Sequence, residues 1–335
     1  MRNALCANLC GLAPLRQTRN GPDYELKLLR GFDPNAGYQN GFLSIGNFDG
    51  VHRGHQQMMA CLVRHAQKLS VPSVVFTFDP HPIQLLRPYE CPPSLTSFDQ
   101  KAELIEACGV DFLVVYATDL RLLNLSAEEF FASVVLDDFK ARGLVEGPNF
   151  FFGRDRAGNS QVLKTLCNGA GIGLDVVPPV FVGASMVSSS VVRRLLVEGD
   201  VAQASDLLGH RYRVVGRVSH GSERGAKIGF PTANLTHVVT VLPRDGVYAG
   251  IVYHDGQRYA AAVNLGPNPT FGEKRRKIEA HLLDFDGDLY GESLELEFVT
   301  RLRDTLTFPN AEMLSRQLKQ DVEQTRGVVS RMLNR

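Results

Sequence analysis

The chain has 335 residues, more than one typical hydrophobic core organises, so its length predicts two domains. Hydrophobic residues make up 44% and charged residues 21%, which is typical of an ordinary globular protein and excludes a long disordered chain. Lysine plus arginine and aspartate plus glutamate number 36 each, so the charge balance gives no reason to expect nucleic acid or an anionic membrane as a partner.

The six cysteines are scattered and all precede residue 168. They form no disulfide framework, so a cytoplasmic location is expected. No run of 18 apolar residues occurs, so the sequence predicts no membrane-spanning helix. Residues 1–22 lack the apolar core of a signal peptide, and we interpret them as a mobile extension.

Residues 42–55 predict a strand, a glycine-bearing turn and the start of a helix. The apolar run 42–45 is followed by the turn 46–50 and by two histidines, His52 and His55. Free backbone N–H groups and the positive end of a helix dipole make such a start an anion site. The alternatives are two solvated histidines or a zinc site, although no further ligands stand nearby at zinc spacing.

Strand-like apolar runs alternate with helix-like amphipathic runs as far as residue 177. The expected strands are 42–45, 73–78, 111–116, 142–146 and 174–177, and later helices are expected over 97–108, 126–139 and 161–168. This alternation predicts a doubly wound parallel sheet, whose ligands lie at the carboxyl ends of the strands. The loops 46–55, 79–82 and 147–153 should therefore meet in one crevice. We expect the two prolines of 79–82 to stiffen a loop.

Two glycine motifs are excluded by context. The run 169–173 follows a helix and precedes a strand, which is the reverse of a dinucleotide fingerprint. No Walker-type motif occurs, which argues against a P-loop kinase. A second anion site is instead predicted where Ser188, Ser189 and Ser190 precede Arg193 at a helix start. An ordinary serine cap explains one of these hydroxyls but not three.

The sequence changes character near residues 205–212, where we place the domain boundary. Alternating runs at 213–218, 247–253, 258–264, 278–283 and 293–299 predict an antiparallel barrel or sandwich. A final helix, capped by Asn310, is expected to pack on the barrel through Met313, Leu314, Leu318 and Val322.

Polar residues of this second half suggest a metal and a base. Thr232 and Asn234 stand two apart, so they share one side of an extended segment, and their oxygens suit Mg²⁺. Glu279 alternates with Ile278 and Ala280, and a carboxylate that faced into a barrel would be costly unless it served as a base. Periodicity alone does not favour Glu279 over Glu295 or Glu297.

Several motifs resemble those of bacterial bifunctional riboflavin kinase/FAD synthetases. In the first half these are residues 46–55, 78–82, 147–153 and 188–193. In the second half they are 229–234, 246–248, 264–266, 269–271 and 288–291. The resemblance covers residues 28 to 325, and its mild departures are Asn149, which is aspartate in some relatives, and Ser190, which is commonly threonine.

The resemblance implies a Rossmann-like FMN adenylyltransferase domain over 23–208 and a flavokinase barrel over 209–335. For the adenylyltransferase it implies catalytic His52 and His55, and ATP or FMN binding by Gly46, Asn47, Phe48, Asp49, Gly50, Gly54, Asn149, Ser188, Ser189, Ser190 and Arg193. For the kinase it implies Glu279 as base, Thr232 and Asn234 as Mg²⁺ ligands, and ATP or flavin binding by Gly225, Lys227, Gly229, Thr232, Asn234 and Asn264.

The implied reactions are riboflavin plus ATP to FMN, then FMN plus ATP to FAD with release of pyrophosphate. Mg²⁺ is the implied cofactor, and only small molecules are expected as partners of a monomer or transient homo-oligomer. One alternative is a single-activity nucleotidylyltransferase whose barrel merely binds substrate. The other is a flavin-sensing or scaffold protein with dead sites.

Overall fold

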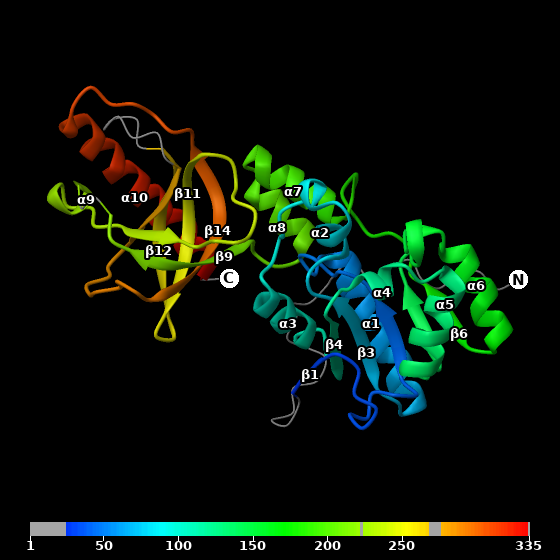
Figure 1. Ribbon diagram of the computed structural model, residues 1–335. Coiled ribbons are helices and arrows are strands. Elements are labelled where there is room, and N and C mark those ends of the chain that lie inside the picture. The colour runs from blue at the N-terminus through cyan, green and yellow to red at the C-terminus, as the bar shows by residue number, and fades with distance from the viewer. Residues whose placement is uncertain (1–24, 222–223, 268–275, 334–335) are drawn as a thin grey trace, which may run out of the picture. The chain divides into compact units, whose positions relative to one another are not determined.

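The computed structural model describes residues 25–221, 224–267 and 276–333, and the chain divides into two compact units (Figure 1). The first unit comprises the described residues up to Pro92 together with Phe98–Val180. The second unit comprises Pro93–Ser97 and the described residues from Phe181 onward. The expected extension 1–22 lies outside the described residues.

A six-stranded parallel sheet forms the centre of the first unit, as the alternation of runs predicts. Its order is β1-β4-β3-β2-β5-β6. The strands are β1 Lys27–Arg30, β2 Phe42–Ile45, β3 Ser73–Phe78, β4 Phe112–Tyr116, β5 Gly143–Glu146 and β6 Gly173–Val176. The sequence analysis missed β1, because this edge strand is mostly exposed and carries charged residues at both ends.

Helices cover both faces of this sheet. They are α1 Arg53–Leu69, α2 Pro82–Leu86, α3 Phe98–Glu106, α4 Leu120–Leu123, α5 Ala127–Phe130 and α6 Ser160–Ala170, with shorter turns η1 Pro88–Glu90 and η3 Arg154–Arg156 and the π-helix η2 Phe131–Asp138. On β2, Phe42 packs in the core that α1 and α3 cover. Its neighbour Leu43 packs in the opposite core, under α4, α5, η2 and α6. Successive residues of the strand thus pack in two different cores, as expected of a sheet with helices on both faces.

Two local expectations are refined by the structure. Ser126 and Glu129 form the capping box that begins α5, and the helix then continues through the π-helix η2. The prediction that the prolines of 79–82 only stiffen a loop is wrong for Pro82, which begins α2. Proline is favoured at a first helical position, where its missing N–H has no intrahelical acceptor, and His81 caps this helix by accepting from the Ile83 N–H at 3.1 Å.

The second unit contains a closed antiparallel barrel, so the barrel alternative is confirmed over the sandwich. Its order is β10-β13-β12-β11-β14-β9. The strands are β9 Arg213–Ser219, β10 Ala233–Thr236, β11 Gly246–His254, β12 Gln257–Gly266, β13 Lys277–Leu282 and β14 Ser293–Arg303, with the one-turn helix α9 Arg224–Lys227. The four-residue strand β10 was not predicted, because it is too short to show a period.

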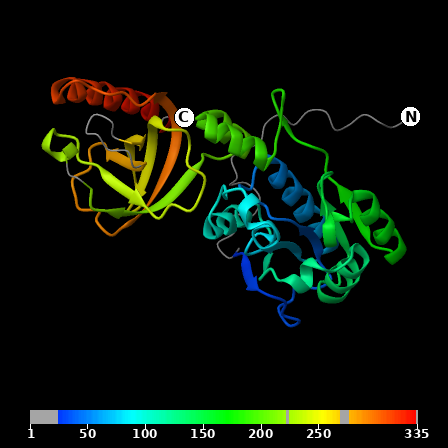
Figure 2. The ribbon, with the colours of Figure 1, turned by 45° about the horizontal axis from the view of Figure 1, so that its top comes forward.

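The terminal helix α10 Ala311–Leu333 packs on β11, β12 and β14 (Figures 1 and 2). Asn310 caps it by accepting from the Met313 N–H at 2.9 Å, as predicted. The predicted contact of Met313 with the barrel is wrong, because this side chain is 49% exposed. The buried stripe of α10 consists of Asp321, Thr325 and Val329 instead. Asp321 is held there by a bidentate pair with Arg303 at 2.6 and 2.9 Å.

Two helices upstream of the barrel belong to the second unit. These are α7 Ser189–Glu198 and α8 Val201–Leu208, which follow the short strands β7 Phe181–Val182 and β8 Ser185–Met186. The Arg244 N–H donates to the Leu196 carbonyl at 2.9 Å, and the Tyr212 N–H donates to Ser205 Oγ at 3.1 Å. These bonds hold α7 and α8 to barrel segments, although both helices begin before the domain boundary that the sequence predicts near residues 205–212.

Candidate active sites

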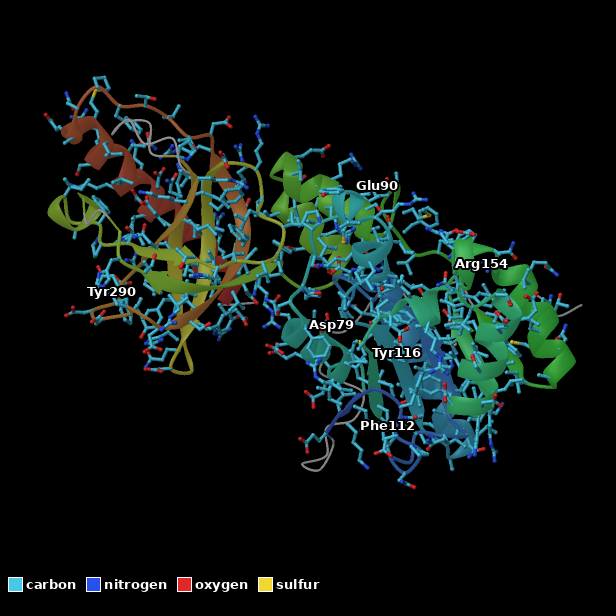
Figure 3. The ribbon with its side chains drawn as sticks, viewed as in Figure 1. Asp79, Glu90, Phe112, Tyr116, Arg154 and Tyr290 are labelled. Atoms are coloured by element: carbon cyan, nitrogen blue, oxygen red, sulfur yellow. The ribbon has the colours of Figure 1, made fainter. Side chains whose placement is uncertain are left out.

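The first candidate site lies at the switch point of the parallel sheet. From β2 the chain moves to β3 on one side, and it later returns to β5 on the other side of β2. Ligands of open α/β sheets bind outside the carboxyl ends of the strands at such a point. The loops after β2 and β5 are the predicted loops 46–55 and 147–153. The end of β3 adjoins the first of them, because the Gly46 N–H donates to the Phe76 carbonyl at 3.0 Å. On its other side the Asp79 N–H donates to the Tyr116 carbonyl of β4 at 3.0 Å (Figure 3).

The turn after β2 has a strained backbone. Phe48 has φ 48°, Gly50 has φ 80° and Val51 has φ 37°. Positive φ suits glycine but is unfavourable for a β-branched residue such as Val51. Strain of this kind is kept mainly where surrounding packing holds a functional geometry, and Phe48 and Val51 are both buried.

His52 and His55 stack on each other at the start of α1. Their ring centroids are 3.6 Å apart with an interplanar angle of 14°. His52 is also the N-cap of α1, because its Nδ1 accepts from the His55 N–H at 3.3 Å. The ring of Phe48 packs edge-on against His55 at 5.3 Å. The two rings therefore lie side by side at the start of α1.

Two polar atoms of this loop are buried without a hydrogen-bond partner among the described residues. They are Nδ1 of His55 and Oδ1 of Asn47. Buried polar atoms are almost always paired, so these two point to a ligand. A Cβ on Gly54 would lie 3.2 Å from the His52 ring, so this glycine makes room for the stacked histidines.

The histidine site is electropositive and partly desolvated. Burial, together with the positive charges of His52 and Lys101, holds the pKa of His55 well below its usual range. Burial also lowers the pKa of Lys101, against the opposing effect of Asp49 and Asp79. The sequence analysis missed Lys101, because it lies within the regular helix α3 and no local motif marks it.

The remaining adenylyltransferase residues are spread over both units. Asn149 is exposed in the loop after β5, in the first unit. Ser188 belongs to the second unit and caps α7 by accepting from the Val191 N–H at 3.4 Å. Ser189 and Ser190 follow within the first turn of α7, and Arg193 Nε donates to the Pro93 carbonyl at 2.8 Å. One serine, Ser188, thus has the capping function, and the other two stand beside it at the start of α7.

The second candidate site is a polar row on the outside of the barrel. Asn234 of β10 is directly opposite Glu279 of β13, and Glu279 is directly opposite Asn264 of β12. Directly opposed side chains share one face, with Cβ atoms about 4.5–5.5 Å apart. The flanking Ile278 and Ala280 are buried inside the barrel. The row therefore faces outward, so Glu279 is half-buried and does not bear the cost of facing into the barrel.

The structure separates Glu279 from the two glutamates that periodicity could not exclude. Glu295 pairs with Arg213 at 2.7 Å, and Glu297 pairs with Arg211 at 3.1 Å. Glu279 instead lies between the two amide side chains of Asn234 and Asn264. Glu295 and Glu297 thus serve in ion pairs, and Glu279 is the glutamate of the three that lies in the amide row.

A tight glycine turn leads into the row. The Phe230 N–H donates to the Gly225 carbonyl at 2.8 Å, and a Cβ on Gly225 would lie 2.3 Å from the Phe230 carbonyl oxygen. Gly229 has φ 85°, so both glycines are required by the backbone. Asn234 Nδ2 donates to the Thr232 carbonyl at 3.4 Å, which directs its other amide atom, Oδ1, away from Thr232. The predicted Lys227 side chain lies outside what the structure describes.

A pocket of about 260 Å³ adjoins this turn. Pro231 and Thr232 line one side, and the loop 285–290, which carries Asp286 and Asp288, lines the other. Tyr290 on this loop stacks on His220 at 3.9 Å between ring centroids (Figure 3). The floor is apolar and is formed by Val218, Ala233, Ala280, Leu282 and Leu289. Thr232 thus connects the pocket with the polar row.

Gly221 positions the Asn234 amide, and Gly221→Ala is expected to slow the reaction at the row. A Cβ on Gly221 would lie 2.3 Å from Asn234 Nδ2, so the amide would have to move. A displacement of about 1 Å in a catalytic site can cost about 100-fold in rate. Steady-state assays should show this loss for the reaction at the barrel only. Gly327→Ala is the matched control, because no atom lies within 4 Å of its added Cβ, and equal rates for both variants would contradict this function of Gly221.

The fold and these sites define a nucleotide-binding α/β unit joined in one chain to a β-barrel unit with its own polar site. Two family models match the chain: that for FAD synthetase matches residues 36–191, and that for riboflavin kinase matches residues 208–329. The chain belongs to the bifunctional riboflavin kinase/FMN adenylyltransferase family.

Relatives with that name are similar over most of the chain. The protein of Escherichia coli (strain K12) is 34% identical over 88% of this chain and 96% of its own. The protein of Pseudomonas fluorescens is 36% identical over 86% and 92%, respectively. That of Haemophilus influenzae is 33% identical over 89% and 97%.

A solved structure titled as a macrolide-efflux protein from Streptococcus pneumoniae has the same fold. It matches with a TM-score of 0.81 and 30% identity, over 89% of this chain and 98% of that one. Among the residues described for the present chain, no helix is long and apolar enough to cross a membrane.

Proposed function

We infer that this chain makes FMN from riboflavin and ATP at the barrel and converts FMN and a second ATP to FAD and pyrophosphate at the parallel sheet. Family membership and the presence of both domains support the two activities. The observation that carries the assignment is that one chain contains two separate polar sites. One is the strained helix start, where His55 Nδ1 and Asn47 Oδ1 are buried without a hydrogen-bond partner among the described residues. The other is the Asn234–Glu279–Asn264 row.

At the barrel, Glu279 accepts the proton of the riboflavin 5′-hydroxyl as that oxygen attacks the γ-phosphate of ATP, the bond from the γ-phosphorus to the bridging oxygen breaks, and ADP leaves. The hard oxygens of Asn234 Oδ1 and the Thr232 hydroxyl fit Mg²⁺, because the amide nitrogen of Asn234 is already directed to the Thr232 carbonyl. When bound, Mg²⁺ neutralises charge on the phosphates. The backbone of the 225–230 turn and the adjoining pocket give the substrates room beside Thr232. Gly225, Lys227, Gly229 and Asn264 complete the proposed ATP and flavin contacts.

At the sheet, an FMN phosphate oxygen attacks the α-phosphate of ATP, and pyrophosphate leaves. No covalent enzyme intermediate is required. His52, His55 and the first N–H groups of α1 stabilise the charge that develops on the α-phosphate and pyrophosphate. Gly46, Asn47, Phe48, Asp49, Gly50 and Gly54 shape the turn. Asn149, Ser188, Ser189, Ser190 and Arg193 are proposed to complete this site.

We also propose functional domain limits of 23–208 and 209–335. The FAD synthetase model ends at residue 191 and the riboflavin kinase model begins at residue 208, which supports a domain limit in this region. The proposed location is the cytoplasm, where ATP is available and thiols stay reduced, and the four free cysteines described by the structure fit it. The proposed partners are small molecules, and the proposed state is a monomer or transient homo-oligomer.

One experiment separates this function from its alternatives. The full chain is mixed with ATP, MgCl₂ and either riboflavin or FMN in separate reactions, and the flavins are separated by chromatography. FMN and FAD should both accumulate, and EDTA or omission of ATP should abolish both. FAD formed only when FMN is supplied would support the single-activity nucleotidylyltransferase. Riboflavin and FMN that both remain unchanged would support a flavin-binding protein without catalysis.

A further inference from the structure

A cysteine, a histidine and an aspartate meet on the first unit outside both candidate sites. Cys61 and His65 are four residues apart on α1, so they lie on one face of the helix. Asp175 lies opposite them on β6, the edge strand of the parallel sheet. Cys61 follows His55 by about two helical turns, or about 9 Å along the axis.

The three side chains converge on one point. His65 Nε2 is 2.9 Å and Cys61 Sγ is 3.1 Å from the same oxygen, Oδ2 of Asp175. All three ligand atoms lie within 4.8 Å of one another. A tetrahedral zinc ion with ordinary bond lengths holds such atoms about 3.3–3.6 Å apart. The two distances to Asp175 would lengthen by about half an ångström, and the Sγ–Nε2 distance, which is at most 4.8 Å, would shorten by up to about 1.2 Å to admit the ion.

The surroundings orient the three ligands. The His65 ring stacks on Phe42 with centroids 5.2 Å apart and an interplanar angle of 11°, which fixes its direction. Cys61 is buried, whereas the side chain of Asp175 is 44% exposed and leaves a route for an ion and a water molecule. Arg64 Nη2 lies 3.2 Å from Cys61 Sγ, where its charge favours a thiolate.

We propose that Cys61, His65 and Asp175 bind one zinc-class divalent cation, with water as the fourth ligand. Thiolate and imidazole select zinc-class ions over Mg²⁺, which prefers oxygen ligands, so this site is distinct from the proposed kinase metal. The ion joins the middle of α1 to β6, which pairs with β5 on one side only. Because α1 also carries His52 and His55, the ion stabilises the unit that holds the adenylyltransferase loop.

The metal-free cluster is a hydrogen-bonded one. Cys61 Sγ donates to Oδ2 of Asp175 at 3.1 Å, and His65 Nε2 lies 2.9 Å from the same oxygen. Binding of the cation releases the thiol proton to solvent and replaces the S–H···O bond by a metal–thiolate bond, as in other cysteine sites.

Cobalt(II), a coloured substitute for zinc, tests the proposal directly on the metal-free full chain. We expect one Co²⁺ per chain, with thiolate charge-transfer absorption and the visible bands of a tetrahedral ion. Cys61→Ser should abolish the charge-transfer absorption. Asp175→Asn should weaken binding at least about tenfold, because even outer partners of a ligand change metal affinity by about 10–100-fold. Millimolar Mg²⁺ should not compete.

Two controls make the result decisive. Cys108→Ser removes another buried cysteine of the first unit and should leave the spectrum unchanged. The double variant Cys6→Ser/Cys10→Ser removes thiols outside the described residues and should also retain it. Loss of the spectrum in that double variant, its persistence in Cys61→Ser, or no Co²⁺ bound by the parent would overturn the proposal.

Thermal unfolding tests whether Cys61→Ser loses the metal or instead fails to fold. Zinc should raise the melting temperature of the parent, because a ligand that binds only the folded state stabilises it. It should leave the melting temperature of Cys61→Ser unchanged while circular dichroism shows the native helix content. An equal zinc-induced shift in both proteins would also contradict the proposed site.

Discussion

Glu279→Gln is expected to abolish FMN formation while FAD formation from supplied FMN continues at the parent rate. Glutamine keeps the size and one acceptor oxygen of glutamate, but it cannot take a proton from the riboflavin hydroxyl. Loss of a general base typically lowers the rate by about 100–10,000-fold. The rates should be measured on the full chain by separating flavins, with riboflavin and FMN offered in separate reactions.

Glu295→Gln is the matched control for this experiment. Glu295 is also a glutamate on an outward-facing position of a barrel strand, but it pairs with Arg213 at 2.7 Å. Its loss should change stability more than phosphorylation. If Glu279→Gln still formed FMN at the parent rate, or if Glu295→Gln were the inactive variant, another group would be the base.

The sequence was sufficient to predict those features that depend on neighbouring residues in the chain. The run 42–55 shows its strand, turn and helix start directly, and the structure adds the stacking of His52 on His55 and the strain at Val51. The parallel sheet follows from alternating apolar and amphipathic runs, because buried strands of such sheets are continuous apolar segments. The barrel follows from period-two runs separated by turns.

Features that depend on register or distant packing were not predictable. The Asn234–Glu279–Asn264 row depends on the pairing of three strands, one of which is only four residues long. A slip of one residue would turn Glu279 into the barrel, so sequence alone left its direction open. Lys101 reaches the histidine site from α3, which is separated from it by about 50 residues of chain. The packing of α7 and α8 with barrel segments is likewise absent from local patterns.

His55→Ala is expected to abolish FAD formation but to leave FMN formation near normal. His55 is a sharper target than His52, because His52 also caps α1 and its loss would disturb the helix. At neutral pH the depressed pKa of His55 makes it a neutral ring with one N–H. In the proposed reaction this N–H donates to the phosphates, and loss of one such donor typically costs about 100–1,000-fold in rate.

Two further variants separate chemistry from packing at His55. His55→Gln retains an N–H donor and should recover part of the activity, whereas His55→Ala also removes the ring that packs on Phe48. Lys68→Ala changes an exposed residue in the last turn of the same helix and should retain FAD formation. The two reactions must be followed separately, because their independence is the prediction. If folded His55→Ala lost FMN and FAD formation equally, the assignment of two active sites would fail, because no direct contact of His55 with the barrel site is required for phosphorylation.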